Sequence, residues 1–287
     1  MTQTAGHNFD HLPFAAAGLA QVLARPKAVA AACVIALAGL GWSYLALLVA
    51  YSDEPFGFGG SLVRTLCRPL PEGSWNAGGV TLVASMWSAM TLAMMLPSAA
   101  PMILTYAGIA DTAARKGERI ISPVVLTFGY VGVWLGFALL ATVVQMTITQ
   151  EALLDSGVTS SSSLFAGAVF IGAGFYQFSA LKHACLTRCR QPFSFFFSNW
   201  ATTLHGVFRL GIKQGLYCIG CCWAMMLVML AVGVMNAVWM AALGVVMTVE
   251  KMLTGRRFTN AIGIALIVGG AGIILAAFAG HWPAQAR

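Results

Sequence analysis

A long apolar stretch of the chain runs from Gln214 to Val249 and contains 36 residues without an Asp, Glu, Lys or Arg. As a single helix these residues would extend over about 54 Å, whereas the hydrocarbon core of a lipid bilayer is only about 30 Å thick. Gly233 and Asn236 lie near the middle of the stretch and are residue types that favour tight turns. The sequence therefore predicts two consecutive transmembrane helices joined by a short turn.

Apolar stretches of similar character occur along the whole chain of 287 residues, of which 59% are hydrophobic and only 9% are charged. A soluble domain has roughly 25% charged residues, so this composition excludes an ordinary soluble enzyme. A spanning helix requires about 20 predominantly apolar residues. The segments that approach this requirement are Ala28–Ala50, Val80–Ala110, Ser122–Gln145, Leu164–Leu181, Gly215–Val232, Val234–Glu250 and Asn260–Gly280. We therefore predict an all-α fold, a polytopic transmembrane helix bundle of about seven helices.

Basic residues are distributed unevenly between the segments that would connect these helices. If the amino terminus lies in the cytoplasm, 13 of the 16 Lys and Arg residues fall on the cytoplasmic side, as the positive-inside rule requires. The net charge of +7 then reflects topology and contact with the lipid bilayer, and no nucleic-acid partner is predicted. In a bacterial inner (plasma) membrane we expect a cytoplasmic amino-terminal tail (1–27), one multi-pass transmembrane bundle domain (28–280) and a periplasmic carboxyl-terminal tail (281–287).

Two groups of potential metal ligands lie near the predicted cytoplasmic ends of neighbouring helices. The first group contains His183, Cys185 and Cys189, and the second contains Cys218, Cys221 and Cys222. Within each group the cysteines are at helical spacing, so they share one face wherever the chain is helical. We expect the segment between the groups, residues 191–213, to fold back along the membrane surface as a loop. Five thiols and one imidazole would then converge at one depth in the membrane.

Three interpretations of these groups remain open. Buried cysteine is often only a small apolar side chain that packs in a core. Thiols on the cytoplasmic side stay reduced, which argues against structural disulfides but leaves redox chemistry of the thiols open. Thiolate and imidazole are also the ligands that suit Cu(I), zinc and iron–sulfur centres. We favour metal binding, because cysteine clusters in cytosol-facing proteins commonly bind metals.

Methionine residues provide a second set of soft donors within the predicted helices. Met90 and Met94 are four residues apart on the second helix, and Met225 follows the second cysteine group on the fifth. A methionine stripe at helical spacing is often ordinary core packing. Thioethers nevertheless suit Cu(I), and they carry no charge that would be costly in lipid. The predicted metal ligands are therefore His183, Cys185, Cys189, Cys218, Cys221, Cys222, Met90, Met94 and Met225.

Several functional signatures are absent from the sequence. There is no Gly-rich phosphate-binding loop ending in Lys-Ser or Lys-Thr, so ATP-driven transport is not indicated. The interiors of the predicted helices contain no Asp, Lys or Arg, so a proton-coupled pump is not indicated either. We predict no catalytic residues and no organic cofactor, and we expect that the protein is not an enzyme.

At these motifs the sequence resembles a bacterial family of uncharacterised, predicted metal-binding integral membrane proteins. The matching pieces are Met86–Pro97, Lys182–Pro192, Gly215–Trp223 and Glu250–Lys251. The resemblance extends over most of the chain from the second predicted helix onward, and the cysteine-containing pieces are its specific part. It implies metal binding in a membrane, without naming the metal or a mechanism.

The sequence thus leads to one main hypothesis and two alternatives. The main hypothesis is an inner-membrane protein that handles a soft transition metal in transport, delivery or homeostasis, with Cu(I) as the expected ion and zinc or iron as other candidates. Its expected partner is a metallochaperone or a metalloenzyme, and its oligomeric state is left open. The first alternative is a membrane oxidoreductase or assembly subunit with a thiolate-bound metal or iron–sulfur centre. The second is a structural subunit whose cysteines only pack.

Overall fold

The computed structural model describes residues 26–50, 77–117, 120–154, 158–232, 237–253 and 255–281, and the regular secondary structure within these ranges is entirely helical. The helices are α2 (Pro26–Ala50), α4 (Ala77–Arg115), α5 (Pro123–Leu154), α6 (Val158–Gln177), α7 (Ala180–Arg190), α8 (Pro192–Ser198), α9 (Leu204–Val232), α10 (Ala237–Met252) and α11 (Arg256–His281). The expected all-α fold is confirmed. Most of the two predicted tails and the predicted turn at residues 233–236 lie outside the described residues.

Within the described residues, five helices are long and apolar enough to cross a membrane: α2, α4, α5, α9 and α11. α6 and α7 pass the same test only as a pair, and they are bent by 65° relative to each other. α10 has 16 residues, fewer than the roughly 20 of a typical span. By length and composition the structure therefore supplies five spans, or six if the bent pair forms one, where the sequence predicts about seven.

The bend divides the predicted fourth segment, Leu164–Leu181, which we expected to be one helix. α6 ends at Gln177, and Ser179 caps the start of α7, because its hydroxyl oxygen accepts a hydrogen bond from the Lys182 N–H at 3.1 Å. Serine at this position satisfies a free helix-end amide and starts α7 in a new direction. As a result, the first cysteine group leaves the line of α6 and packs against α9.

The segment between the two cysteine groups is mostly helical, whereas the sequence analysis predicts a surface loop. Pro192 is the first residue of α8, a position where proline is favoured because no amide donor is needed there. α9 begins at Leu204, eleven residues before the predicted start of the fifth span at Gly215. The Thr203 hydroxyl stabilises this start by accepting a hydrogen bond from the Gly206 N–H at 3.1 Å. The second cysteine group therefore lies in the middle of a long helix rather than at its beginning.

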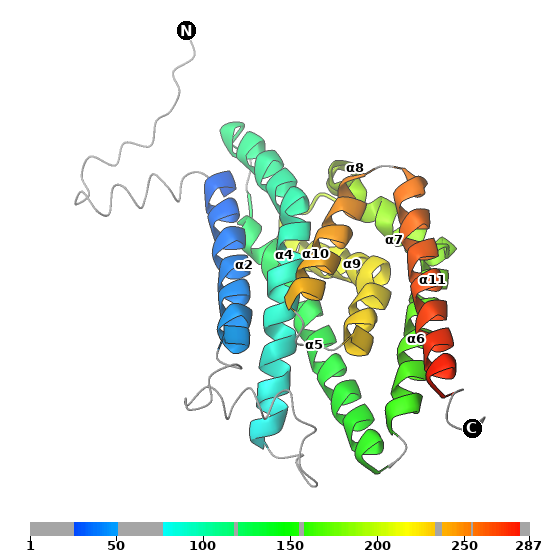
Figure 1. Cartoon of the computed structure of the whole chain (residues 1–287). Helices are drawn as coiled ribbons and strands as arrows, with labels where there is room; N and C mark the ends of the chain where they lie inside the picture. Colours follow the sequence, from blue (N-terminus) through cyan, green and yellow to red (C-terminus); the bar gives the residue numbers. More distant parts are fainter. Residues whose placement is uncertain are drawn as a thin grey trace, which may run out of the picture.

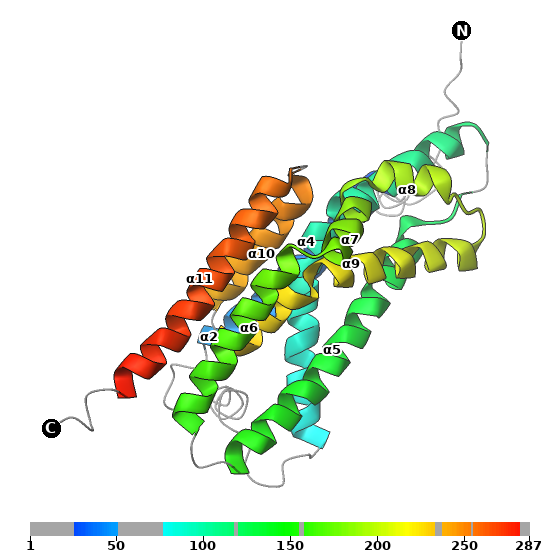
Figure 2. The same ribbon diagram turned by 90° about the vertical axis from the view of Figure 1, so that its right-hand side faces the viewer.

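α9 packs closely against α5 at a crossing of glycines. A Cβ atom at Gly129 would overlap the carbonyl oxygen of Phe208, and one at Gly211 would overlap the carbonyl oxygen of Leu126. Small residues at such positions let two helix backbones approach within a bilayer. In Figure 2 the first part of α9 runs across the bundle over α5, and its last part turns along the bundle. α9 thereby enters the core that it shares with α4 and α10.

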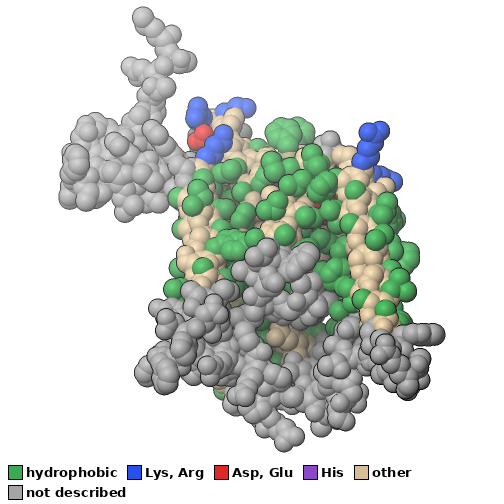
Figure 3. Space-filling model, in the orientation of Figure 1, with side chains coloured by type: hydrophobic (Ala, Val, Ile, Leu, Met, Phe, Trp, Pro, Cys, Tyr) green, Lys and Arg blue, Asp and Glu red, His purple; other side chains and the backbone are tan. Residues whose placement is uncertain are grey.

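The helices alternate in direction, which places their connections at two ends of the bundle. In Figure 1, α2, α5 and α11 descend, whereas α4, α6 and α10 ascend. α2 and α11 form opposite edges, and α4, α9 and α10 lie between them. The Lys and Arg side chains visible on this face gather at the upper end of the bundle in Figure 3, with hydrophobic side chains covering the faces of the helices below.

Candidate metal centre

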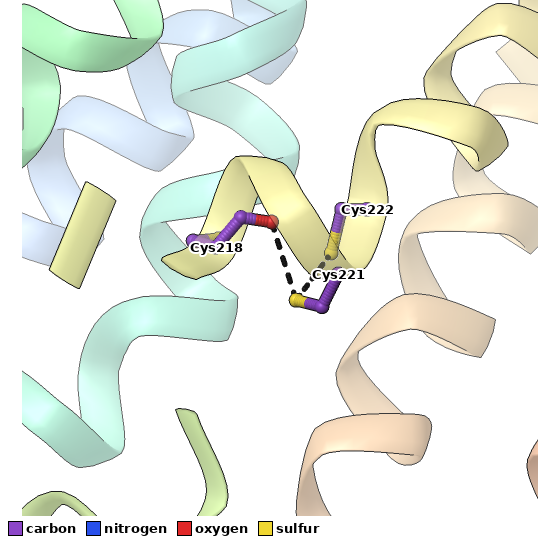
Figure 4. A group of neighbouring side chains, drawn as sticks. All are labelled: Cys218, Cys221 and Cys222. Carbon is purple, nitrogen blue, oxygen red and sulfur yellow. Dashed lines mark hydrogen bonds between the residues drawn. The ribbon is translucent and has the colours of Figure 1, made fainter. Parts of the chain in front are cut away.

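Three cysteine side chains of α9 form a compact group in the protein interior, which we name the thiol cluster. The Sγ atoms of Cys218, Cys221 and Cys222 all lie within 4.8 Å of one another, and the three residues are only 2%, 1% and 1% exposed. The Cys221 thiol lies 3.3 Å from the Cys222 sulfur and donates a hydrogen bond to the Cys218 carbonyl at 3.2 Å (Figure 4). The spacing of these residues along one helix explains the grouping, as the sequence predicts.

α7 brings the first cysteine group against the thiol cluster. The Cys189 sulfur lies 3.9 Å from the Cys221 sulfur. Cys185 packs against Gly220 of α9, where an added Cβ atom would come within 2.5 Å of the Cys185 sulfur. His183 is six residues before Cys189, about 9 Å along the helix axis, and it is partly exposed. The two predicted groups therefore meet, with Cys189 as the contact to the thiol cluster.

Two polar side chains from other helices contact the Cys218 sulfur. The Lys251 ammonium group lies 3.0 Å from this sulfur and donates a second hydrogen bond to the Ser98 hydroxyl at 2.7 Å. The Tyr130 hydroxyl lies 3.0 Å from the same sulfur and donates to the Met95 carbonyl at 3.2 Å. A cation beside a thiol favours the thiolate, which is the form that binds metals. Neither residue is among the predicted ligands. The available signals for Lys251 were its position just after the long uncharged stretch and its place in one of the pieces that resemble the metal-binding family.

A buried ion pair joins α7 to α10 beside this site. Lys182 Nζ lies 2.8 Å from Glu250 Oε2, and both side chains are 1% exposed. The Arg190 guanidinium group donates hydrogen bonds of 2.8 and 3.0 Å to the main-chain carbonyl of Glu250. The second carboxylate oxygen, Oε1, has no hydrogen-bond partner among the described residues. The pair holds α7, and with it Cys189, against the end of α10.

The predicted methionine ligands lie in the core of the bundle. They are Met90, Met94 and Met225, all buried. Met94 packs against α10, because a Cβ atom at Gly244 would lie 3.3 Å from its terminal methyl carbon. The Met225 sulfur accepts a hydrogen bond from the Gln177 side-chain amide at 3.1 Å. The three predicted ligands are thus core residues of α4 and α9.

The described residues combine membrane-length apolar helices with a buried group of three thiols that are close enough to hold one metal ion. The family model described as "PpoB2: Copper chaperone" matches residues 84–273, about two thirds of the chain. The chain therefore belongs to this family of copper chaperones. The match supports the metal-related family that the sequence resembles, and it includes both cysteine groups. No curated protein and no solved structure matches the chain.

Proposed function

We propose that the protein binds Cu(I) at the thiol cluster within a bacterial inner membrane and passes the ion to a protein partner. The observation that carries this proposal is the placement of three buried sulfurs within 4.8 Å of one another. Membership of the copper chaperone family supports copper as the ion. A chaperone exchanges its ion with partners without transforming a substrate, so we expect no enzymatic activity.

The dimensions of the site suit one soft ion. Metal–thiolate bonds of roughly 2.3 Å place the sulfurs around a single ion about 3.8–4.0 Å apart. The separations of 3.3 Å between Cys221 and Cys222 and 3.9 Å between Cys221 and Cys189 lie close to this value. Zinc would accept the same sulfurs, but thiolate and thioether donors together select Cu(I). The chemistry of the sulfur ligands therefore favours copper, the metal named by the family.

The cysteines of α7 provide a route between the surface and the thiol cluster. Cys185 and Cys189 are only partly buried, whereas the thiol cluster is fully buried. Because the Cys189 sulfur lies 3.9 Å from the Cys221 sulfur, an ion held by one can pass to the other without losing sulfur coordination. We propose that His183, Cys185 and Cys189 receive Cu(I) from a cytoplasmic metallochaperone by ligand exchange, without ATP.

Methionines extend the soft donors beyond the thiol cluster. Tyr130 contacts both the Met95 carbonyl and the Cys218 sulfur, so α4 passes the cluster at Met95. α4 ascends toward the basic end of the bundle in Figure 1, and Met90 and Met94 precede Met95 in this helix, whereas Met225 follows the cysteines of α9; all three are buried. Thioethers are suitable next ligands for Cu(I). We propose that they take the ion toward the periplasm, where a metalloenzyme receives it.

This proposal includes a topology of seven spans with a cytoplasmic amino terminus and a periplasmic carboxyl terminus. The gathering of Lys and Arg at one end of the bundle supports it, because basic residues face the cytoplasm. The alternating directions of α2, α4, α5, α6, α10 and α11 are compatible with it. The route for copper then begins at the basic end and continues into the apolar core.

X-ray absorption at the copper edge tests the proposal on the purified full-length protein loaded anaerobically with one equivalent of Cu(I). We expect one bound copper per chain, coordinated by sulfur at about 2.3 Å, and a colourless sample. A shell dominated by nitrogen or oxygen, or no copper above a buffer blank, would contradict the proposal. Visible absorption with bound iron would favour the oxidoreductase alternative, because iron–sulfur centres are coloured.

Replacing Lys251 by Met is expected to lower the affinity for Cu(I) by about 10–100-fold, the range found for groups that contact a metal ligand. The cause would be loss of the ammonium group 3.0 Å from the Cys218 sulfur. Competition with a chromogenic Cu(I) chelator measures the affinity. Lys213→Met removes the same charge from an exposed position of α9 and is expected to bind like the wild type. Equal affinities of the two variants would show that Lys251 does not support the site.

A further inference from the structure

A cavity of about 750 Å³ lies beside two lysines, and its lining residues do not include the cysteines of the thiol cluster. It lies between the start of α2, the last turns of α4, and α8. Its lining includes Lys27, Thr105, Lys116, Phe196 and Trp200. Cavities of this volume hold small molecules. The combination of ammonium groups, a hydroxyl group and aromatic walls suits a ligand that is anionic at one end and apolar at the other.

Two ammonium groups give the cavity its charge. Lys27 of α2 lies over Gly108 of α4, where an added Cβ atom would be 2.8 Å from the Lys27 Cε and 3.2 Å from its Nζ. Lys116 follows the end of α4 and is exposed. The nearby carboxylate of Asp111 is paired with Arg115 at 3.0 Å. Neither lysine forms an ion pair with a described residue.

α8 gives the cavity its apolar rim. Phe193 and Phe197 line the cavity and are 63% and 82% exposed, with their rings stacked at a centroid distance of 6.2 Å. Helices that lie in the membrane interface place Phe, Trp and Leu side chains at the boundary between lipid headgroups and acyl chains. With α8 at that boundary, the two ammonium groups would lie at the depth of the lipid phosphates.

We propose that this cavity binds one anionic phospholipid, with its phosphate between Lys27 and Lys116 and its acyl chains against Phe193 and Phe197. Basic pockets between membrane helices on the cytoplasmic side bind anionic headgroups in this way. The two cations exclude an apolar occupant alone, and the exposed phenyl rings are unsuited to a free anion. The inference rests on the membrane placement proposed above and is independent of copper.

Native mass spectrometry of the full-length, delipidated protein tests this site with added phosphatidylglycerol or phosphatidylcholine. Lys27→Gln combined with Lys116→Gln should lower the affinity for phosphatidylglycerol about 30-fold, which is about fivefold for each cation at a lipid surface. Binding of phosphatidylcholine should not change. Arg256→Gln combined with Arg257→Gln is the matched control, because it removes two exposed cations from the same end at the opposite edge of the bundle.

A second variant tests the cavity itself. Thr105→Trp fills the cavity without changing charge and should also prevent binding of phosphatidylglycerol. Normal binding by this variant, or equal losses in the lysine and arginine variants, would overturn the proposal. Displacement of the lipid by inorganic phosphate at similar concentration would assign the site to free phosphate instead. A protein that is soluble without detergent would refute the proposed membrane placement. The other outcomes test only the lipid site.

Discussion

Cys221→Ser together with Cys222→Ser is expected to lower the affinity of the protein for Cu(I) more than about 100-fold. Loss of a group that only supports a metal ligand already costs about 10–100-fold, and this variant removes two of the three sulfurs of the thiol cluster. Competition with a chromogenic Cu(I) chelator measures the change. Cys33→Ser, which alters an exposed thiol of α2, is the matched control and should bind copper like the wild type.

The single variant Cys189→Ser separates the binding site from the route that loads it. Because Cys189 is partly buried and contacts the cluster from α7, its loss should slow copper loading more than it lowers the final affinity. Stopped-flow mixing with a Cu(I)–thiol complex measures the rate of copper loading.

Unchanged affinity for Cu(I) in the double serine variant would refute the thiol cluster as the binding site. Unchanged loading in Cys189→Ser would refute only the route.

Lys182→Met is expected to destabilise the protein by about 3–5 kcal/mol, the cost of leaving one partner of a buried ion pair without the other. The Glu250 carboxylate would remain in the interior, with one oxygen already lacking a hydrogen-bond partner among the described residues. Unfolding in mixed micelles by titration with sodium dodecyl sulfate, followed by circular dichroism, measures the free energy of unfolding.

The double variant Lys182→Met with Glu250→Leu provides the control for this effect. Replacing both partners of a buried pair by apolar residues is often neutral, so most of the stability should return. The Arg190 hydrogen bonds remain available in this variant, because they are made to the main-chain carbonyl at position 250. A double variant as unstable as Lys182→Met would show that packing, and not the unpaired charge, is the cause.

The class of fold was predictable because it depends on local composition. Long apolar stretches such as Gln214–Val249 require helices in a bilayer whatever their partners. The limits of the helices were less predictable. α9 starts at Leu204 because a capping threonine precedes it, but Arg209 and Lys213 placed this part of the sequence among the basic cytoplasmic segments. The bend after Gln177 depends on a single serine within an apolar stretch.

The candidate site was predictable where it depends on spacing within one helix. Cys218, Cys221 and Cys222 share a face because helix geometry alone places them together. The contacts of Lys251 with Cys218 and of Lys182 with Glu250 join residues that are 33 and 68 positions apart. Such pairs depend on how helices pack, and no local pattern specifies them. The contact of Lys251 with a thiol and the buried ion pair of Lys182 therefore became visible only in the folded structure.

Gly220 controls how closely α7 approaches α9, and therefore how many sulfur ligands can reach one ion. Because this residue has no side chain, α7 approaches α9 closely enough for the Cys185 sulfur to occupy the space of a Cβ atom. A single methyl group at position 220 would push the two helices apart and lengthen the bridge from Cys189 to Cys221, while leaving every sulfur in the sequence. The coordination number offered to a bound ion would thus be changed from three to four, or back, by the distance between two helices.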